Sequence, residues 1–189
     1  SNIADVTYTW EATTSDSITG FPIGEQTDSS ILSWTLINSC NLTGSINISV
    51  TPISNDCSGD TLDFTITVNP TPQIEDKTEV ICSSGTFNVN PTNNCTTGEI
   101  VPSGTTYSWD VSTNTSITGA SASTGSVISQ TLINTSATEQ IVTYTVTITS
   151  ATGSCSGAPF DIVVTVDPVA TVVATVSQAV LCSLDTTAI

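Results

Sequence analysis

The chain repeats its own sequence once, with a period of roughly 98 residues, and this repeat constrains its fold more than any other feature. Short blocks recur in the same order in both copies, so the chain holds nearly two copies of one domain-sized unit. The matching blocks are Tyr8-Thr9-Trp10 with Tyr107-Ser108-Trp109, Ser17–Gly20 with Ser116–Gly119, Thr35–Asn38 with Thr131–Asn134, Cys57–Gly59 with Cys155–Gly157, Thr67–Pro70 with Thr165–Pro168, and Val80–Ser83 with Val180–Ser183.

Apolar residues alternate with polar ones inside each copy, which is the period of a strand buried on one face. The chain is also rich in the β-branched residues Thr, Val and Ile, which favour strands. We therefore expect an all-β fold of tandem immunoglobulin-like antiparallel β-sandwiches, with Trp109 anchoring the core of the second. The expected strands of the complete copy lie near residues 73–76, 79–82, 85–90, 105–111, 126–133, 140–149 and 159–167.

The two copies are cut at different points of the repeat. Residues 1–70 form a first sandwich that lacks its opening strands, and residues 71–168 form a complete second one. Residues 169–189 resemble the opening strands of a further repeat, because Val180 to Ile189 matches Val80 to Val89. They predict either part of a third repeat or a donor segment that completes the first sandwich of a neighbouring subunit by strand addition. Head-to-tail addition of this kind generates a filament.

The charge balance excludes several classes of function. The net charge is −16, with one Lys, no Arg and no His. Nucleic acid and anionic membranes are therefore not expected partners, since both require basic groups. Nucleophilic catalysis would have no histidine base, and Lys77 is the only basic side chain. We expect no enzyme activity, no cofactor and no direct membrane insertion.

Carboxylates offer the only candidates for a metal or catalytic site. Asp56, Asp60 and Asp63 form the tightest acidic cluster and are candidate calcium ligands, because hard cations take carboxylate oxygens. We favour a solvated loop, because the second copy has Ser, Ala and Asp in the nearest positions and no EF-hand spacing occurs. Glu75, Asp76 and Glu79 are a similar candidate for an ion between domains.

Six cysteines without a CxxC pair or a histidine favour disulfides over zinc, and thus an extracytoplasmic location. Six cysteines allow fifteen connectivities. We expect Cys82 to bond Cys155 within the second domain, and its equivalent to join Cys57 to Cys182 of a neighbouring subunit or repeat. Cys40 and Cys95 have no counterparts in the other copy and would connect the two domains. A standard sandwich opposes the Cys82–Cys155 bond, because it places these two segments at opposite poles.

The repeat resembles the PKD-like and immunoglobulin-like repeats of Bacteroidetes surface proteins. The resemblance lies in Ile81–Phe87, Val101–Trp109, Ser126–Leu132, Val142–Thr147 and Cys155–Phe160, running into Val164–Pro168. It implies a large cell-surface adhesin, gliding-motility filament or fibre component, exported by type IX secretion, with no catalytic residues to carry over. It also implies O-glycosylation of a Ser or Thr that follows Asp, for which Ser17, Thr61 and Thr186 are the candidates.

Together these observations predict a structural subunit of an extracellular bacterial surface filament, with copies of itself or neighbouring repeats as partners. The first alternative is a repeat fragment of a larger cell-surface adhesin. The second is a secreted glycan-binding module, with Trp34 as the aromatic residue best placed to bind surface glycans. Core packing is nevertheless the favoured interpretation of all three tryptophans, and Trp10 and Trp109 alternate with apolar neighbours.

Overall fold

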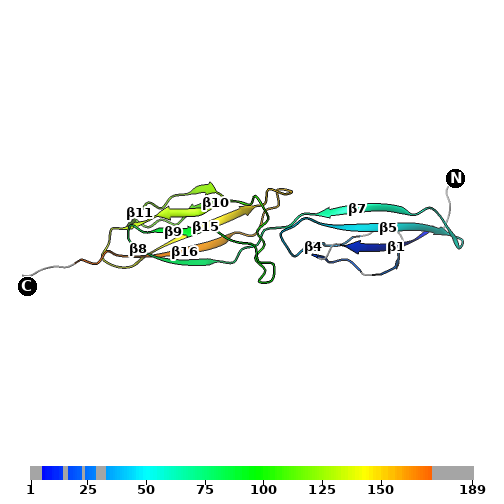
Figure 1. Cartoon of the computed structure of the whole chain (residues 1–189), viewed down its shortest axis with the longest axis horizontal. Coiled ribbons are helices and arrows are strands. Elements are labelled where there is room, and N and C mark those ends of the chain that lie inside the picture. The colour runs from blue at the N-terminus through cyan, green and yellow to red at the C-terminus, as the bar shows by residue number, and fades with distance from the viewer. Residues whose placement is uncertain (1–5, 15–16, 23, 29–32, 172–189) are drawn as a thin grey trace, which may run out of the picture.

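The computed structural model describes residues 6–14, 17–22, 24–28 and 33–171, and contains strands but no helix in these ranges. Two β-sheet domains lie end to end along the long axis of the molecule, joined by a short linker at residues 69–76 (Figure 1). The first holds β1 to β7 and the second β8 to β16. Among the described residues no helix has the length and apolarity to span a membrane.

The second domain is a complete sandwich. One sheet has the strand order β12-β10-β15-β16-β8, and β8 lies parallel to β16 while the other pairs are antiparallel. The opposite layer consists of the pairs β9-β13 and β11-β14. The bounds are β8 Lys77–Cys82, β9 Thr86–Val89, β10 Thr106–Val111, β11 Ile117–Thr118, β12 Ser123–Gly125, β13 Ile128–Thr131, β14 Ile133–Asn134, β15 Gln140–Thr149 and β16 Phe160–Asp167.

The first domain repeats the same plan, and its described residues contain no counterparts of β8 and β9. Its sheet has the order β3-β1-β5. The strand β5 also pairs, antiparallel, with the short β6 and with β7. The pair β2-β4 corresponds to β11-β14. The bounds are β1 Thr7–Thr14, β2 Ile18–Thr19, β3 Gln26–Asp28, β4 Ile37–Asn38, β5 Gly44–Ser54, β6 Cys57–Ser58 and β7 Leu62–Val68.

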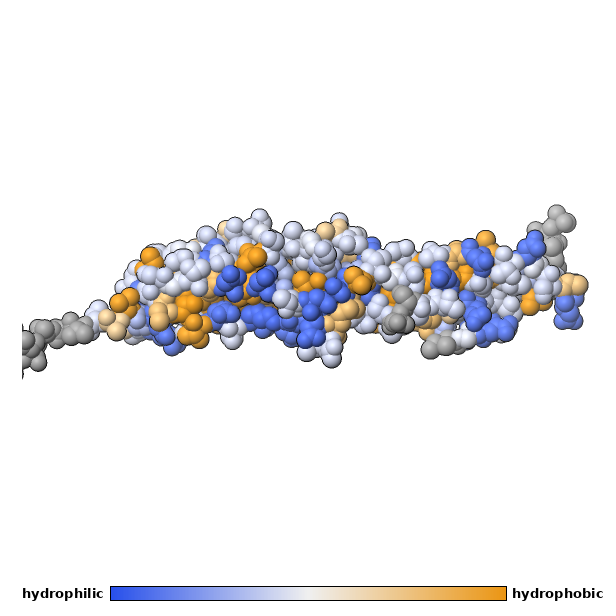
Figure 2. All heavy atoms as spheres, in the orientation of Figure 1, coloured by the Kyte–Doolittle hydropathy of each residue, from blue (hydrophilic) through white to orange (hydrophobic). Residues whose placement is uncertain are grey.

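The alternation seen in the sequence places the core of the second domain. Every second side chain of β15 and β16 is buried, as expected for strands that face a core on one side. Trp109 and Tyr144 are buried in this core, and Phe87 of β9 packs against Tyr144 with ring centroids 5.1 Å apart. On the face shown in Figure 2, apolar residues lie in small patches between polar ones.

Most of the expected strands are present, with three differences. Residues 73–76 contain only an isolated bridge between Gln73 and Ile100 in place of a strand. The short strands β11 and β12 were not expected, because two or three residues carry too little alternation to be recognised. The segment 126–133 is divided into β13 and β14, which pair with different strands.

Candidate functional site

The last strand of the first domain is uncovered where the last strand of the second is buried. β7 and β16 occupy equivalent positions, because Thr67–Pro70 of the first repeat matches Thr165–Pro168 of the second. Leu62 is 65% exposed and its counterpart Phe160 is 3% exposed. Phe64 is 40% exposed and its counterpart Ile162 is fully buried. The first domain thus exposes an apolar strand face that the second domain keeps inside its core.

Two strands account for this difference in burial. In the second domain β8 pairs with the outer edge of β16, and β9 pairs with β13 and places Phe87 and Val89 in the core. The described part of the first domain has no counterpart to either strand, so no described strand pairs with the outer edge of β7. We call one surface the β7 face: it consists of the exposed Leu62 and Phe64, the half-buried Trp34 and Leu36, and the outer edge of β7.

The absence of a β9 counterpart also changes the backbone of the opposite layer. Residues 33–35 correspond to Ser129–Thr131 of β13 but form no strand. Leu132 donates its amide hydrogen to the Gly85 carbonyl and accepts a hydrogen bond from the Ser84 amide. Leu36, its counterpart, makes neither bond within the part of the chain that the structure describes. The β7 face therefore offers backbone groups that no described residue pairs with, as well as apolar side chains.

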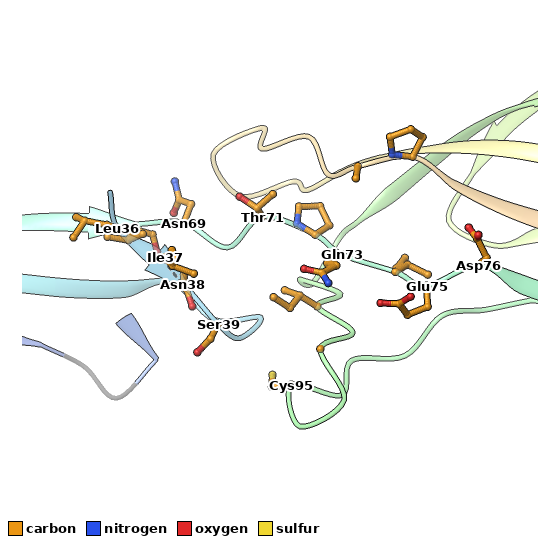
Figure 3. Close-up of a pocket in the computed structure, with 17 residues that line it drawn as sticks. Leu36, Ile37, Asn38, Ser39, Asn69, Thr71, Gln73, Glu75, Asp76 and Cys95 are labelled. Carbon is orange, nitrogen blue, oxygen red and sulfur yellow. Dashed lines mark hydrogen bonds between the residues drawn. The ribbon is translucent and has the colours of Figure 1, made fainter. Parts of the chain in front are cut away.

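An open crevice of about 780 Å³ lies where the β7 face meets the second domain. Leu36, Asn38 and Asn69 line it from the first domain, and Gln73 and Cys95 line it from the second (Figure 3).

Asn38 is held at this crevice by a frame that both domains share. Its side-chain amide donates to the Leu42 and Val68 carbonyls at 2.7 and 3.0 Å. Asn134 donates in the same way to Thr138 and Val166. In the second domain the Ser83 hydroxyl also accepts a hydrogen bond from the backbone amide of Asn134, at 3.0 Å. Among the described residues of the first domain, no counterpart of Ser83 accepts a hydrogen bond from the backbone amide of Asn38.

A disulfide joins the two domains beside this crevice. Cys40, in the loop between β4 and β5, is bonded to Cys95, in the loop between β9 and β10, with their Cα atoms 5.1 Å apart. The connection expected from the unmatched cysteines is therefore present. The disulfide therefore connects the two domains covalently at a second point, in addition to the peptide linker.

The expected bond between Cys82 and Cys155 is wrong. Both residues are free thiols. β8 runs parallel to β16, so Cys82 lies opposite Asp167 at the end of that strand, whereas Cys155 precedes its first residue. The whole length of β16 separates the two, far beyond the 7 Å that a disulfide allows between Cα atoms. Cys57 is a free, exposed thiol, and Cys182 lies outside the described residues.

The carboxylates are not gathered into a metal site. Among the described residues no three His, Cys, Asp or Glu side chains lie close enough to hold an ion, so Asp56, Asp60 and Asp63 stay apart. The second acidic group, Glu75, Asp76 and Glu79, is not assembled either: Asp76 accepts a hydrogen bond from the Asp161 amide, and nearby Lys77 pairs with Glu99.

The glycosylation candidates lie in different settings. Thr61 is exposed, and its hydroxyl contacts that of Thr51 at 2.8 Å. Ser17 is half-buried, and its carbonyl accepts a hydrogen bond from the Ser39 amide. Thr186 lies outside the described residues. Modification of all three stays a prediction.

The tryptophans pack inside the domains. Trp10 and Trp109 are buried at equivalent positions. Trp34 is half-buried against Trp10, with ring centroids 4.9 Å apart. None of the three forms an exposed aromatic platform for a sugar.

Comparison of the sequence with known protein families identifies one family that matches both repeats. The PKD-like domain family matches residues 1–72 and 79–170, one match for each repeat. The chain belongs to this family, and its all-β architecture agrees with that membership. Among curated proteins none matches the chain. PKD-like domains are typically non-catalytic, and membership together with the disulfide indicates an extracellular or secreted adhesion or structural module.

Proposed function

We propose that the protein is the structural subunit of an extracellular filament, in which residues 177–189 of one copy complete the first domain of the next. The observation that carries this proposal is the β7 face, because Leu62 and Phe64 are exposed where Phe160 and Ile162 are buried. An exposed apolar edge strand is a template for pairing with another chain. Addition of a strand to such an edge is a common mode of recognition between proteins.

The segment proposed as the donor matches the strands that close the second domain. Val180-Leu181-Cys182-Ser183 corresponds to Val80-Ile81-Cys82-Ser83, which covers β16. In the same register Ser183 would reach Asn38 at the junction crevice, as Ser83 reaches Asn134. The donor would thus supply both the edge strand and the hydrogen bond that the first domain lacks.

One pair of positions argues that this segment fits the first domain in particular. In the second domain Gln130 of β13 lies opposite Phe87 of β9. The first domain has Trp34 at the position of Gln130, and the donor has Thr187 at the position of Phe87. The large and small partners are exchanged, so the total volume across the strand pair stays similar. Such compensation is expected where two segments pack against each other.

Linker length and charge favour a second copy as the donor. Cys82 lies thirteen positions after Asn69, and Cys182 lies fifteen positions after the equivalent Asp167. The second domain of one copy could therefore approach the first domain of the next much as the two domains of one chain approach each other. In addition, residues 168–184 carry no charge, which removes a source of repulsion between copies of net charge −16.

Assembly of this kind does not close on itself. The donor follows the second domain and the acceptor is the first domain, so each added copy presents a new acceptor. Such heterologous contacts produce open filaments when the rotation between copies does not form a ring. The internal Cys40–Cys95 bond would keep each link of the filament stiff.

Point variants of the full chain test the proposal by sedimentation and electron microscopy. Phe64→Asp places a charge on the β7 face, and Leu181→Asp places one in the donor. Ile141→Asp is the matched control, because Ile141 is a 51% exposed strand residue of the second domain, away from the β7 face. We expect filaments from the wild type and the control, and at least tenfold less assembled protein from the other two variants.

A competition experiment covers the case in which a variant fails to fold. A synthetic peptide of residues 174–189, added in excess to the wild-type chain, should cap the first domain and shorten the filaments, and a scrambled peptide should not. Equal assembly of Phe64→Asp and the control would contradict the proposal. A wild-type chain that stays monomeric would also contradict it, and would favour a repeat array in which a preceding segment of a longer adhesin supplies the missing strands.

A further inference from the structure

The free cysteine of β8 lies at the outer end of the second domain. Cys82 is the last residue of β8 and pairs with Asp167, the last residue of β16. The following Ser83 amide donates to the Asp167 carbonyl at 2.8 Å. The Cys82 thiol is exposed. A strand with the position and direction of β8 therefore places its cysteine at the pole of the domain where the next domain of an array begins.

The free cysteine of the β15–β16 hairpin lies at the inner end of the same domain, against the linker. Gly153 sits so close to Asn69 that a Cβ atom there would lie 2.2 Å from the Asn69 side chain, and Gly157 is equally tight against the Pro72 carbonyl. Cys155 lies between these two glycines, and its thiol contacts the Gly153 carbonyl at 3.8 Å. The hairpin thus holds Cys155 beside the end of β7. Figure 1 shows β7 and this hairpin along the same upper edge of the molecule.

These two placements combine if the donor segment enters the first domain as proposed above. Asn69 is the counterpart of Asp167, so the β8–β16 register would set Cys182 of the incoming copy opposite Asn69. Parallel neighbours in a sheet lie about 4.8 Å apart, and Asn69 already touches the hairpin that carries Cys155. We propose that Cys182 of one copy forms a disulfide with Cys155 of the next. This inference rests on the proposed function.

The same kind of pairing, between the cysteine of a β8-type strand and the hairpin cysteine of the next domain, applies at the junction between copies. The β5–β6 hairpin carries Cys57 at the far pole of the first domain, and in both hairpins the two residues before the cysteine have positive φ: Asn55 and Asp56, and Gly153 and Ser154. The strand cysteine of the preceding domain is Cys82, so Cys82 of one copy bonds Cys57 of the next. The β5–β6 hairpin is shorter than its counterpart, and the longer linker after Asp167 allows for this difference.

This pairing replaces the bond between Cys57 and Cys182 expected from the sequence. A donor strand parallel to β7 would put Cys182 beside Asn69, at the opposite end of the strand from Cys57. The distance is the one that prevents Cys82 from reaching Cys155 in the second domain. With Cys40–Cys95 inside each chain, the rule uses all six cysteines and places two covalent bonds at every contact between copies.

The chemistry of each bond is ordinary thiol–disulfide exchange. A cysteine thiolate attacks a small-molecule disulfide and releases one thiol, and the second cysteine then displaces the other half as a thiol. Two protein thiols lose two protons and two electrons, and the small disulfide is reduced to two thiols. An oxidising extracellular environment supplies such a disulfide.

The test uses the full chain, assembled in buffer that contains oxidised glutathione as the small disulfide. Free thiols are then alkylated and the material is digested with pepsin at low pH, which suppresses exchange. Mass spectrometry should find the linked peptides Cys182–Cys155 and Cys82–Cys57. The Cys57→Ser/Cys155→Ser variant should lose the covalent ladder on a non-reducing gel by at least tenfold and still form filaments. The Cys40→Ser/Cys95→Ser variant is the matched control and should keep the ladder.

The outcomes separate this inference from the proposed function. Filaments with four alkylated cysteines per chain, or with any other linkage, would overturn the cysteine pairing and leave strand complementation in place. A chain that forms neither filaments nor a covalent ladder would overturn both.

Discussion

The indole rings of Trp10 and Trp34 pack with centroids 4.9 Å apart and planes inclined by 46°. The equivalent pair in the second domain is Trp109 and Gln130, which share Ser121: the Trp109 indole and the Gln130 amide both donate to its carbonyl, at 3.1 and 2.7 Å. Gln130 also accepts a hydrogen bond from Tyr144, whose counterpart in the first domain is Ile48. The first domain has thus replaced a polar network by an aromatic contact at the β7 face.

This replacement predicts the behaviour of a size exchange between Trp34 and Thr187. Thr187→Phe alone should reduce assembly several-fold, because two large side chains would then compete for one space. The double variant Trp34→Leu/Thr187→Phe keeps a similar total volume and should recover most of the loss. Assembly measured by sedimentation decides between these results. If the double variant assembles no better than Thr187→Phe, the two positions do not pack together.

Alkaline pH should destabilise the second domain through its buried tyrosines. Burial raises the pKa of Tyr144 to about 12, and burial and then the charge of Glu99 raise the pKa of Tyr107. In the unfolded chain these tyrosines ionise near pH 10. Their contribution to the free energy of unfolding is therefore complete below that pH and is lost as the pH rises towards 12. For Tyr144 the full loss is roughly 2–3 kcal/mol, at 1.36 kcal/mol per pKa unit.

Denaturant unfolding at several pH values, with tyrosinate absorbance as the probe, measures this loss. Tyr144→Phe should be less stable at neutral pH, because its hydrogen bond to Gln130 is gone, and should lose less stability between pH 10 and 12. An equally steep alkaline loss in the variant would show that Tyr144 does not cause it.

Removal of the Cys40–Cys95 bond should loosen the angle between the domains without unfolding either. Neither cysteine belongs to the buried core of its domain. The Cys40→Ser/Cys95→Ser variant should therefore keep its strand content by circular dichroism. Residual dipolar couplings should then require two alignment tensors, where the wild type requires one. A single tensor for the variant would mean that the linker alone fixes the angle.

Trypsin offers a direct check on the linker and on this disulfide. Lys77 is the only Lys or Arg, lies in β8 and pairs with Glu99, so cleavage requires local unfolding. We expect the native chain to resist trypsin and the unfolded chain to give one cut. Because Cys40 and Cys95 lie on opposite sides of Lys77, the two fragments should separate on a gel only after reduction. Separation without reductant would show that the bond is absent.

The long strands could be predicted from the sequence because their side chains alternate over six or more residues, as in β10, β15 and β16. The sequence also indicates which strands have no counterpart within residues 1–70, because the blocks that precede Tyr107 in the second copy are not repeated there. The predicted disulfide between Cys82 and Cys155 was wrong because the sequence does not show the direction of β8. Alternation indicates which face of β8 is buried but not the direction in which β8 runs beside β16, and that direction decides which pole Cys82 reaches.

Hydrogen exchange at β7 tests the central claim most directly. Within the described ranges no strand pairs with the outward amides of Leu62–Val68, so in the isolated subunit they should exchange much faster than the equivalent amides of Phe160–Asp167. In assembled wild-type protein the donor strand should slow the β7 amides at least a hundredfold, and in the Leu181→Asp variant it should not. Amides of β7 that exchange equally fast before and after assembly would contradict strand complementation at this edge.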